Sequence, residues 1–138
     1  MDEFKVNEEH AADTKLIGFD YQFLYFLYLI LDLNTGEKLG FEILDDIHIE
    51  CPNGNIVLLQ TKHTVQKNAK GDQINLTERD SDLWKTINNW ILFIEASEEI
   101  ETFLIKTSFK LVTNKSIKTN LFIENILKFQ AKKLPPRL

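Results

Sequence analysis

Residues 55–63 read Asn-Ile-Val-Leu-Leu-Gln-Thr-Lys-His, and this run decides how the rest of the chain is interpreted. Its apolar, β-branched residues predict a strand of a sheet. Because side chains alternate between the two faces of a strand, Gln60 and Lys62 share one face and Thr61 lies on the other. An amide and an ammonium group at the end of a buried strand cost free energy unless they have polar partners. Carboxylates on a neighbouring strand would be such partners.

The preceding run, Glu42-Ile-Leu-Asp45-Asp46-Ile, supplies those carboxylates. Residues 40–50 alternate between apolar and polar types, which predicts a strand or a strand pair, and the turn at 52–55 then leads into the next strand as a hairpin. In a regular strand only Asp46 shares the face of Gln60 and Lys62, whereas a bulge would exchange it with Asp45. Glu42 faces the same way as Asp46 but lies roughly 13 Å from it, at about 3.3 Å per residue, so we expect a secondary role.

This residue set suits hydrolysis of a phosphodiester. Magnesium binds oxygen ligands in octahedral geometry and keeps several waters, so few protein ligands suffice. Asp46, the side-chain oxygen of Gln60 and the backbone carbonyl of Thr61 form a possible ligand set. Lys62 would orient the attacking water or neutralise developing charge. The alternative is a plain ion pair between a buried lysine and an aspartate on the next strand.

Composition fits one globular domain. The chain has 138 residues, of which 43% are hydrophobic and 27% charged. A single cysteine, Cys51, excludes an internal disulfide and favours the cytoplasm. The longest apolar run, residues 23–31, is too short for a bilayer span, so we expect no membrane association.

The charge is divided unevenly along the chain. The formal net charge of -5 argues against a general polyanion binder. Residues 1–60, however, carry twelve acids and three bases, a net of -9, and residues 61–138 carry nine acids and thirteen bases, a net of +4. An acidic half that attracts cations beside a basic half that attracts phosphates is compatible with a phosphodiester substrate. An unevenly charged solvated surface is the plainer interpretation.

The chain order of the expected elements indicates a single α/β (α+β) domain. We expect a polar leader at 1–15, one domain at 16–133 and a tail or linker start at 134–138. Apolar spacing predicts helices over 19–33, from 77 to about 96, and over 120–132, and a further strand over 103–113. The polar segment 64–76 is a loop. This order predicts a sandwich with a mixed central sheet.

Four motifs of the chain resemble a known family. They are Gly18-Phe-Asp20-Tyr-Gln22, Glu42-x-x-Asp45-Asp46-Ile, Leu59-Gln60-Thr-Lys62-His63 and Leu111-Val-Thr-Asn114. Together they resemble the PD-(D/E)xK nuclease superfamily, most closely the nuclease domains of CD-NTase-associated anti-phage endonucleases and more distantly Mrr-type restriction enzymes. The resemblance implies a restriction endonuclease-like α-β-β-β-α-β core, a divalent metal (Mg²⁺ or Mn²⁺) and cleavage of DNA in antiviral defence.

Carried over by position, Asp46 corresponds to the metal-binding aspartate, Gln60 to the second acidic position and Lys62 to the catalytic lysine. Gln22 stands where many relatives place a glutamate. The chain departs from the pattern in lacking a proline before the aspartate and in having two neutral glutamines, which leave less anionic charge on the metal. The second hypothesis is therefore a catalytically inactive DNA-binding or assembly module on the same fold.

The remaining candidates are weaker. His63, like Glu42 and Asp45, is assigned a supporting role, and His48 is taken with it as a supporting or surface histidine. Trp84 and Trp90 are expected in core or partner contacts rather than in base stacking. Lys67 and Lys70 are candidate contacts to nucleic-acid phosphates. The resemblance further implies DNA as substrate, a homo-oligomer, and a sensor domain or partner chain.

Overall fold

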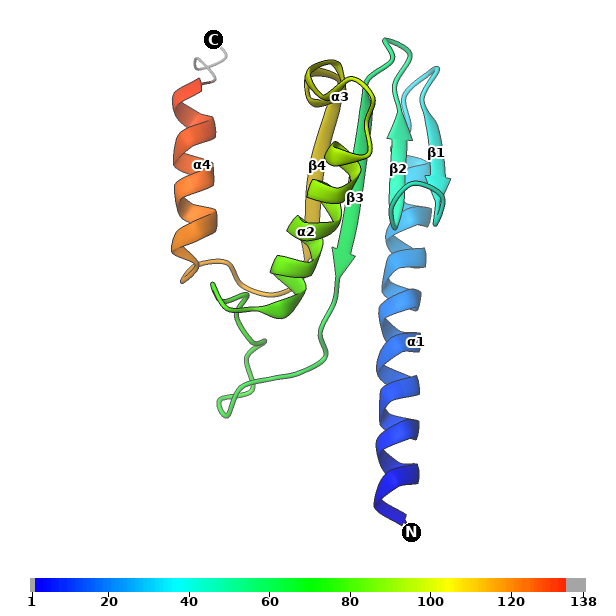
Figure 1. Cartoon of the computed structure of the whole chain (residues 1–138). Coiled ribbons are helices and arrows are strands. Elements are labelled where there is room, and N and C mark those ends of the chain that lie inside the picture. Colours follow the sequence, from blue (N-terminus) through cyan, green and yellow to red (C-terminus); the bar gives the residue numbers. More distant parts are fainter. Residues whose placement is uncertain (1, 134–138) are drawn as a thin grey trace.

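The structure is a computed structural model that describes residues 2–133, with side chains from residue 15 to 132. Within that range it is a mixed α/β fold with four helices and a four-stranded sheet (Figure 1). The elements in chain order are α1 (Asp2–Leu31), β1 (Lys38–Phe41), β2 (Ile47–Glu50), β3 (Ile56–Lys62), α2 (Ser81–Glu95), α3 (Ile100–Lys106), β4 (Thr107–Thr113) and α4 (Leu121–Lys133).

The sheet is mixed, as the sequence predicts. Its strand order is β1-β2-β3-β4, with β1, β2 and β3 antiparallel and β3 parallel to β4. The β2–β3 hairpin turns at Gly54, which adopts a φ of +81° that glycine tolerates well. Parallel strands need a long crossover, and the segment that contains α2 and α3 makes it between β3 and β4.

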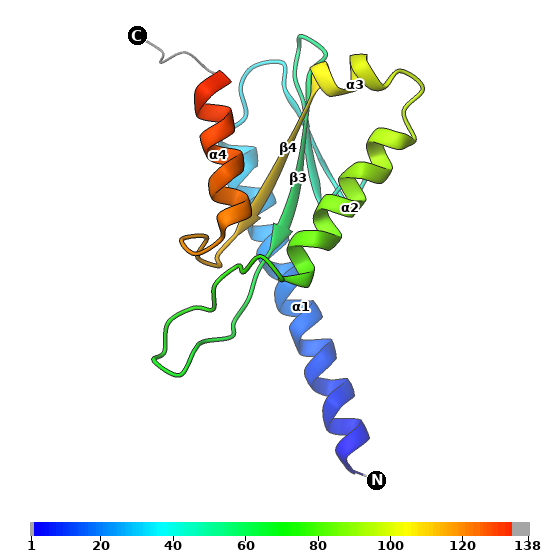
Figure 2. The ribbon, with the colours of Figure 1, turned by 60° about the vertical axis from the view of Figure 1, so that its left-hand side comes forward.

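Each face of the sheet is covered by a different helix (Figure 2). Phe41, whose register aligns it with Ile47 and Leu59, contacts phenylalanines of α1, so these side chains point toward α1. On the other face, the ring of Phe109 lies 5.3 Å from that of Trp90 in α2. The residues that alternate with the α1-facing positions, Gln60 among them, therefore point toward α2.

Three boundaries differ from the sequence prediction. The first helix, expected over 19–33, begins at Asp2 and ends at Leu31. Residues 2–15, which were expected to be a polar leader, are therefore helical. A strand over 103–113 is wrong in its first part, because Ile100–Lys106 forms α3 and the backbone becomes extended only at Thr107 (φ -108°, ψ 131°). Residues 40–50 were expected to form a strand or a strand pair, and the structure has the pair, with β1 ending at Phe41, β2 beginning at Ile47 and a turn at 42–46 between them. The expected tail at 134–138 lies outside the described residues.

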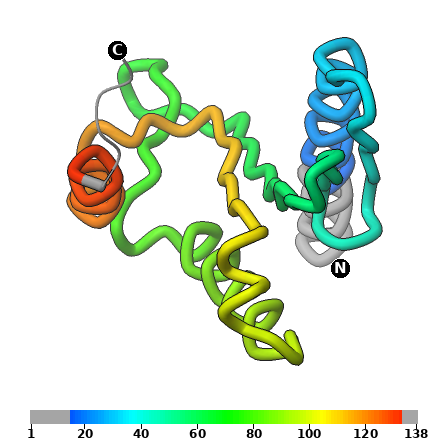
Figure 3. The backbone as a smooth tube through the Cα atoms, turned by 90° about the horizontal axis from the view of Figure 1, so that it is seen from above, coloured from blue at the N-terminus to red at the C-terminus, as the bar shows by residue number. Residues whose placement is uncertain are grey.

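The core is small for the number of large apolar residues. Among the described side chains, the buried hydrophobic residues are Ile47, Leu58, Leu59, Leu76 and Leu83. In the view from above, α1 and the β1–β2 hairpin lie on one side of the molecule and α4 on the other (Figure 3). Trp84 of α2 contacts Phe122 of α4, with ring centroids 5.1 Å apart. None of the helices described is both long and apolar enough to cross a lipid bilayer.

Candidate functional site

The acidic run folds into a turn between β1 and β2. The backbone N–H of Glu42 donates to the carbonyl of Asp46 at 2.9 Å, and Glu42 has a φ of +54°, an uncommon left-handed conformation for a residue other than glycine. The regular strand expected through these residues is therefore wrong. The roughly 13 Å separation expected between Glu42 and Asp46 is wrong for the same reason, because the turn closes on itself.

This turn forms one wall of an open surface cavity of about 570 Å³ between the sheet and α2. Asp45, Asp46 and Glu42 all line the cavity, together with Gln60 of β3. Strand alternation had admitted only one of the two aspartates. The other lining residues are Ile43, Leu44, Asn89, Leu92, Phe93 and Ala96. The cavity thus joins three carboxylates and two amides with an apolar rim.

Asp46 is held by the adjacent strand and by α1. Its Oδ2 atom accepts hydrogen bonds from the backbone N–H of Thr61 at 2.7 Å and from the Thr61 hydroxyl at 2.9 Å. The buried side chain of Gln22 donates to the backbone carbonyl of Asp46 at 3.2 Å and also to the Glu42 carboxylate. These contacts fix both the turn and the direction of the Asp46 carboxylate.

Asp45 is held from α2. The indole N–H of Trp90 lies 3.2 Å from Asp45 Oδ2, and the backbone N–H of Asp46 lies 3.0 Å from Oδ1. Burial raises the pKa of Asp45, and the two hydrogen bonds and the Lys62 charge only partly offset that effect. Lys62 thus interacts electrostatically with this wall, although its side chain is not among those that line the cavity.

Gln60 presents an unpaired amide to the cavity. The residue is 5% exposed, and its side chain lines the cavity and makes no hydrogen bond to any other side chain or backbone group between residues 15 and 132. Among the described side chains, the polar atoms that are buried without a partner are Nδ1 of His48 and of His63. The Gln60 amide therefore opens on the cavity, where a water, cation or substrate can bind to it.

The oxygen atoms of the site suit a hard cation, although few of them are available as ligands. Asp46 Oδ1 carries no hydrogen bond from the described residues, and the Gln60 amide oxygen is a second, neutral donor. Within the described part of the chain, no group of three or more His, Cys, Asp or Glu side chains is placed to hold a metal ion. Any cation here would therefore keep several waters, as magnesium commonly does.

Both candidate histidines lie away from the cavity. His63 stacks on Tyr21 of α1, with ring centroids 4.4 Å apart and planes at 24°, so it belongs to the opposite face of the sheet from Gln60. His48 is 4% exposed, so the interpretation as a surface histidine is wrong for it. Its ring packs over Gly40 of β1.

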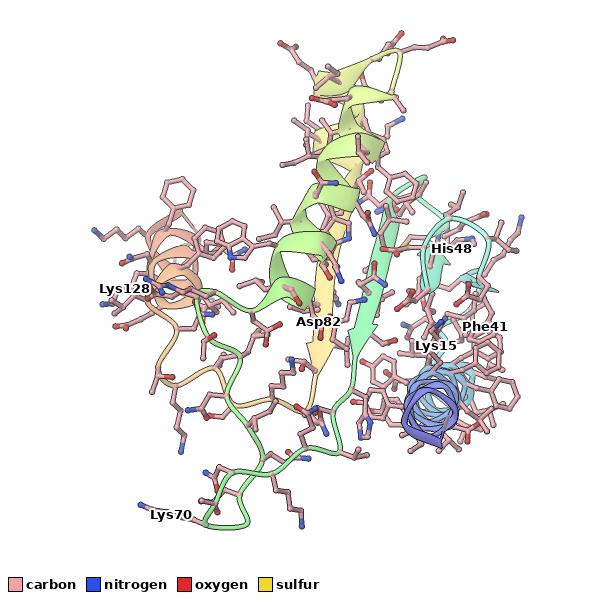
Figure 4. The ribbon with its side chains drawn as sticks, turned by 60° about the horizontal axis from the view of Figure 1, so that its bottom comes forward. Lys15, Phe41, His48, Lys70, Asp82 and Lys128 are labelled. Carbon is pink, nitrogen blue, oxygen red and sulfur yellow. The ribbon has the colours of Figure 1, made fainter. Side chains whose placement is uncertain are left out.

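Lys67 and Lys70 occupy the long connection that follows β3. Both are exposed, and this segment protrudes from the body of the molecule, with Lys70 at its outer end (Figure 4). The Asn68 side chain shapes the tip by accepting hydrogen bonds from the backbone N–H groups of Lys70 and Asp72. At its base, Asn114 pairs with the backbone of Thr64 through two hydrogen bonds.

Sequence reasoning missed the contribution of α2. Trp90 makes the expected core contact through its ring, which packs against Phe109, but its indole N–H also donates to Asp45 of the site, which was not predicted. Asn89 and Phe93 also line the cavity and were not considered. Their spacing of four residues, which places them on one face of a helix, was the signal available. The hydroxyl of Thr61, a hydrogen-bond donor to Asp46, was missed because only its backbone carbonyl was weighed.

Comparison with family models, curated proteins and solved structures finds no match to this chain. The chemistry of the site therefore rests on its own geometry. Three acidic residues and the unpaired amide of Gln60 line a cavity large enough for a hydrated cation and part of a substrate. A lysine lies within electrostatic range of one of those carboxylates. This arrangement can bind a divalent cation and place a positive side chain near a reacting anion.

Proposed function

We propose that the protein is a metal-dependent DNA endonuclease in which Asp46 and Gln60 hold Mg²⁺ or Mn²⁺ and Lys62 assists hydrolysis of a phosphodiester. The observation that carries this proposal is the amide of Gln60, which has no hydrogen-bond partner among the described residues and lines the same cavity as Glu42, Asp45 and Asp46. Carboxylates brought together at a site repel one another, and a divalent cation relieves that repulsion.

The contacts of each residue indicate its role in the proposed reaction. When bound, the cation would polarise the phosphoryl group and lower the pKa of a water. Thr61 holds the Asp46 carboxylate in one orientation through two hydrogen bonds, and Gln22 steadies the turn that carries it. Lys62, at the end of β3, supplies positive charge to the phosphate as negative charge develops in the transition state.

The finer fold assignment belongs to the same proposal. The element order α1-β1-β2-β3-α2-β4 supports a restriction endonuclease-like core, with α3 inserted before β4 and α4 added after it. The motifs that resemble PD-(D/E)xK nucleases fall on α1, the β1–β2 turn, β3 and the end of β4. On this basis we place the protein in antiviral defence or restriction, as the nuclease module of a bacterial effector.

A second function has one specific observation in its favour. Asp46 Oδ2 already accepts two hydrogen bonds from Thr61, and both glutamines of the motif positions are neutral. A site with so little free negative charge would bind a divalent cation weakly. The alternative is therefore a catalytically inactive DNA-binding or assembly module.

Cleavage of supercoiled plasmid DNA in Mg²⁺ or Mn²⁺ separates the two functions. We expect nicking or linearisation that EDTA abolishes. Asp46→Asn and Lys62→Met should each lower the rate by at least about 100-fold, since they remove a cation ligand and a charge that stabilises the transition state. Glu101→Gln, at an exposed acid of α3 away from the cavity, is the matched control and should leave the rate unchanged.

The outcomes are distinct. Metal-dependent cleavage that persists in both Asp46→Asn and Lys62→Met would refute the site. An absence of cleavage by the wild-type protein over a wide range of protein concentrations, together with retained DNA binding, would favour the inactive module. Thr61→Val tests the support of Asp46 separately: it removes the hydroxyl bond and keeps the backbone N–H, so we expect a rate reduction of about tenfold rather than full inactivation.

A further inference from the structure

Helix α1 is apolar on the side that faces away from the sheet. Gln22, 7% exposed, marks the side that faces the turn and the sheet. Leu31 follows Gln22 by nine residues, about two and a half helical turns, so it points in the opposite direction. It is 88% exposed, and Leu24, on the same outer side, is 63% exposed. A helix that is apolar all round is normally buried all round.

The outer residues follow a coiled-coil spacing. Positions 17, 20, 24, 27 and 31 are separated by three and four residues in alternation, the a and d positions of a heptad. We call this set the outer seam; its members are Ile17, Asp20, Leu24, Leu27 and Leu31. The four apolar members are between 39% and 88% exposed. Single exposed hydrophobic residues are ordinary, but a periodic stripe of them marks an interaction surface.

We infer that the outer seam is a dimer interface, at which α1 packs antiparallel against α1 of a second copy of this chain. Helices with a heptad stripe bury it by packing knobs into holes of another helix. A second copy offers the same stripe at the same spacing, so no other segment needs to be supplied. In an antiparallel pair, a positions face d positions, and Leu24 of each copy then meets Leu27 of the other.

Asp20 selects the antiparallel orientation. In a parallel pair the two Asp20 side chains would lie side by side in the interface, where like charges repel. In the antiparallel register they lie eleven residues apart along the helix axis, about 16 Å at 1.5 Å per residue. That distance exceeds the Debye length of about 8 Å at physiological ionic strength, so their repulsion is screened.

The size of the seam predicts a weak dimer. Fully burying one large aliphatic side chain removes roughly 60–120 Å² from water. The exposed parts of the seam residues and of the adjacent Tyr28 therefore give on the order of 400 Å² per copy, against about 800 Å² per partner in a standard interface. We expect self-association in the micromolar range, visible as a mass that rises with protein concentration. This inference does not depend on the proposed nuclease activity.

Sedimentation velocity or light scattering of the purified chain from about 1 to 200 µM tests the interface. Leu24→Glu and Leu31→Glu should weaken dimerisation by at least tenfold, whereas Asp20→Leu should strengthen it by a similar factor. Ile105→Glu, which changes an 83% exposed residue of α3, is the matched control and should not alter the mass. A monomer at every concentration, or a dimer that Leu24→Glu leaves intact, would overturn the proposal.

Disulfide cross-linking tests the orientation, in a Cys51→Ser background that removes the native thiol. In the antiparallel register Asp20 of one copy faces Leu31 of the other. The double variant Asp20→Cys/Leu31→Cys should therefore form a covalent dimer under mild oxidation, while neither single variant should. A covalent dimer from Asp20→Cys alone would show a parallel pair and contradict the register. Both experiments measure the mass of the protein and not DNA cleavage. A negative result in either would contradict the dimer and leave the proposed nuclease activity untouched.

Discussion

Glycine at position 40 allows β1 and β2 to pair, because a side chain there would clash with the ring of His48. The two residues are register partners on adjacent strands. A Cβ atom on Gly40 would lie 1.9 Å from Cε1 of His48, which is far inside van der Waals contact. Glycine is therefore required by the close approach of the buried imidazole and not by its backbone dihedrals.

Gly40→Ala should destabilise the protein by about 1–3 kcal/mol, because the imidazole must leave its place in a packed site. The measurement is the free energy of unfolding from chemical denaturation. His48→Ala provides the control, since it removes the ring that clashes. We expect Gly40→Ala to cost much less in the His48→Ala background, which is a coupling that a double-mutant cycle detects. Equal costs in both backgrounds would show that the clash is not the cause.

Asp45 provides a pH-dependent test of the site. Burial raises the pKa of its carboxyl above the ordinary 3.8. At a pH between the two pKa values, the folded state therefore holds a proton that the unfolded state has released. Stability is then lost as the pH rises through the raised pKa and is recovered below the ordinary pKa. An amide at this position has no such penalty and can still accept the hydrogen bond from Trp90.

We therefore expect Asp45→Asn to raise the melting temperature at pH 7 by about 1–3 °C, since the group is only half-buried, and to leave it unchanged near pH 4. Thermal unfolding of both proteins between pH 4 and 8 gives the difference. Asp72→Asn, at an exposed acid, should differ from the wild type in melting temperature by the same amount at every pH in this range. A gain for Asp45→Asn that is independent of pH would contradict the proposed cause.

Among the elements, α2 is fixed at its beginning by an ion cluster. Asp80 caps the helix by accepting a hydrogen bond from the backbone N–H of Asp82. The buried Lys115, which follows β4, lies 2.7 Å from Asp80 and 3.3 Å from Asp82. This cluster ties the start of α2 to the end of β4. It thereby sets the position of the helix that carries Trp90 to the site.

Lys115→Met should cost about 3 kcal/mol of unfolding free energy, because it leaves a largely buried carboxylate without its partner. Lys128→Met is a matched control: it removes the 2.6 Å pair with Glu124 on exposed α4 and should cost less than about 0.5 kcal/mol. Denaturant unfolding of the two variants measures the difference. Similar small effects in both would show that the buried cluster adds no more stability than a surface pair.

The same cluster gives a pH dependence of opposite sign to that of Asp45. Burial alone would raise the pKa of Asp80, but the hydrogen bonds from Lys115 and from the backbone of Asp82 more than offset it and lower the pKa below 3.8. The stabilisation is therefore complete above the ordinary pKa and is lost as the pH falls below about 4. In Lys115→Met this part of the acid destabilisation should disappear.

At this scale the sequence predicts most elements but not where they begin and end. The period of two in residues 56–62 and the apolar spacing of residues 83–94 follow from local side-chain burial, and β3 and α2 lie where these patterns indicate. Residues 100–106 contain aromatic and β-branched types that suit either state, and the pattern alone does not distinguish a short helix from a strand.

The site was predictable in its residue types and not in its geometry. Alternation along β3 correctly placed Gln60 and Thr61 on opposite faces of the strand, and Asp46 does line the same cavity as Gln60. The left-handed backbone conformation at residue 42 falls on a glutamate and not on a glycine or asparagine, so the sequence did not indicate it. The turn that brings Asp45 and Glu42 to the cavity was therefore not predicted. The hydrogen bond from Trp90 depends on tertiary packing between segments 45 residues apart.

Over the whole molecule, charged residues from the two halves of the chain lie in different places. Glu42, Asp45 and Asp46 of the first half line the cavity, whereas Lys67 and Lys70 of the second half lie on the protruding segment after β3. In DNA binding, such lysines would displace counterions from phosphates and not read bases. Under the proposed function, the cation and these lysines would contact different positions along a bound strand.

Lys67→Glu/Lys70→Glu should weaken binding to duplex DNA of any sequence by about tenfold or more and lower the salt-dependence slope by about 2, one for each phosphate that a lysine no longer neutralises. The measurement is fluorescence anisotropy over several salt concentrations, in an Asp46→Asn background that prevents cleavage. Lys106→Glu, at an exposed lysine where α3 meets β4, should change neither quantity by a comparable amount. If the double variant binds with an unchanged slope, the phosphates bind to another surface, and the protruding segment has no part in holding DNA.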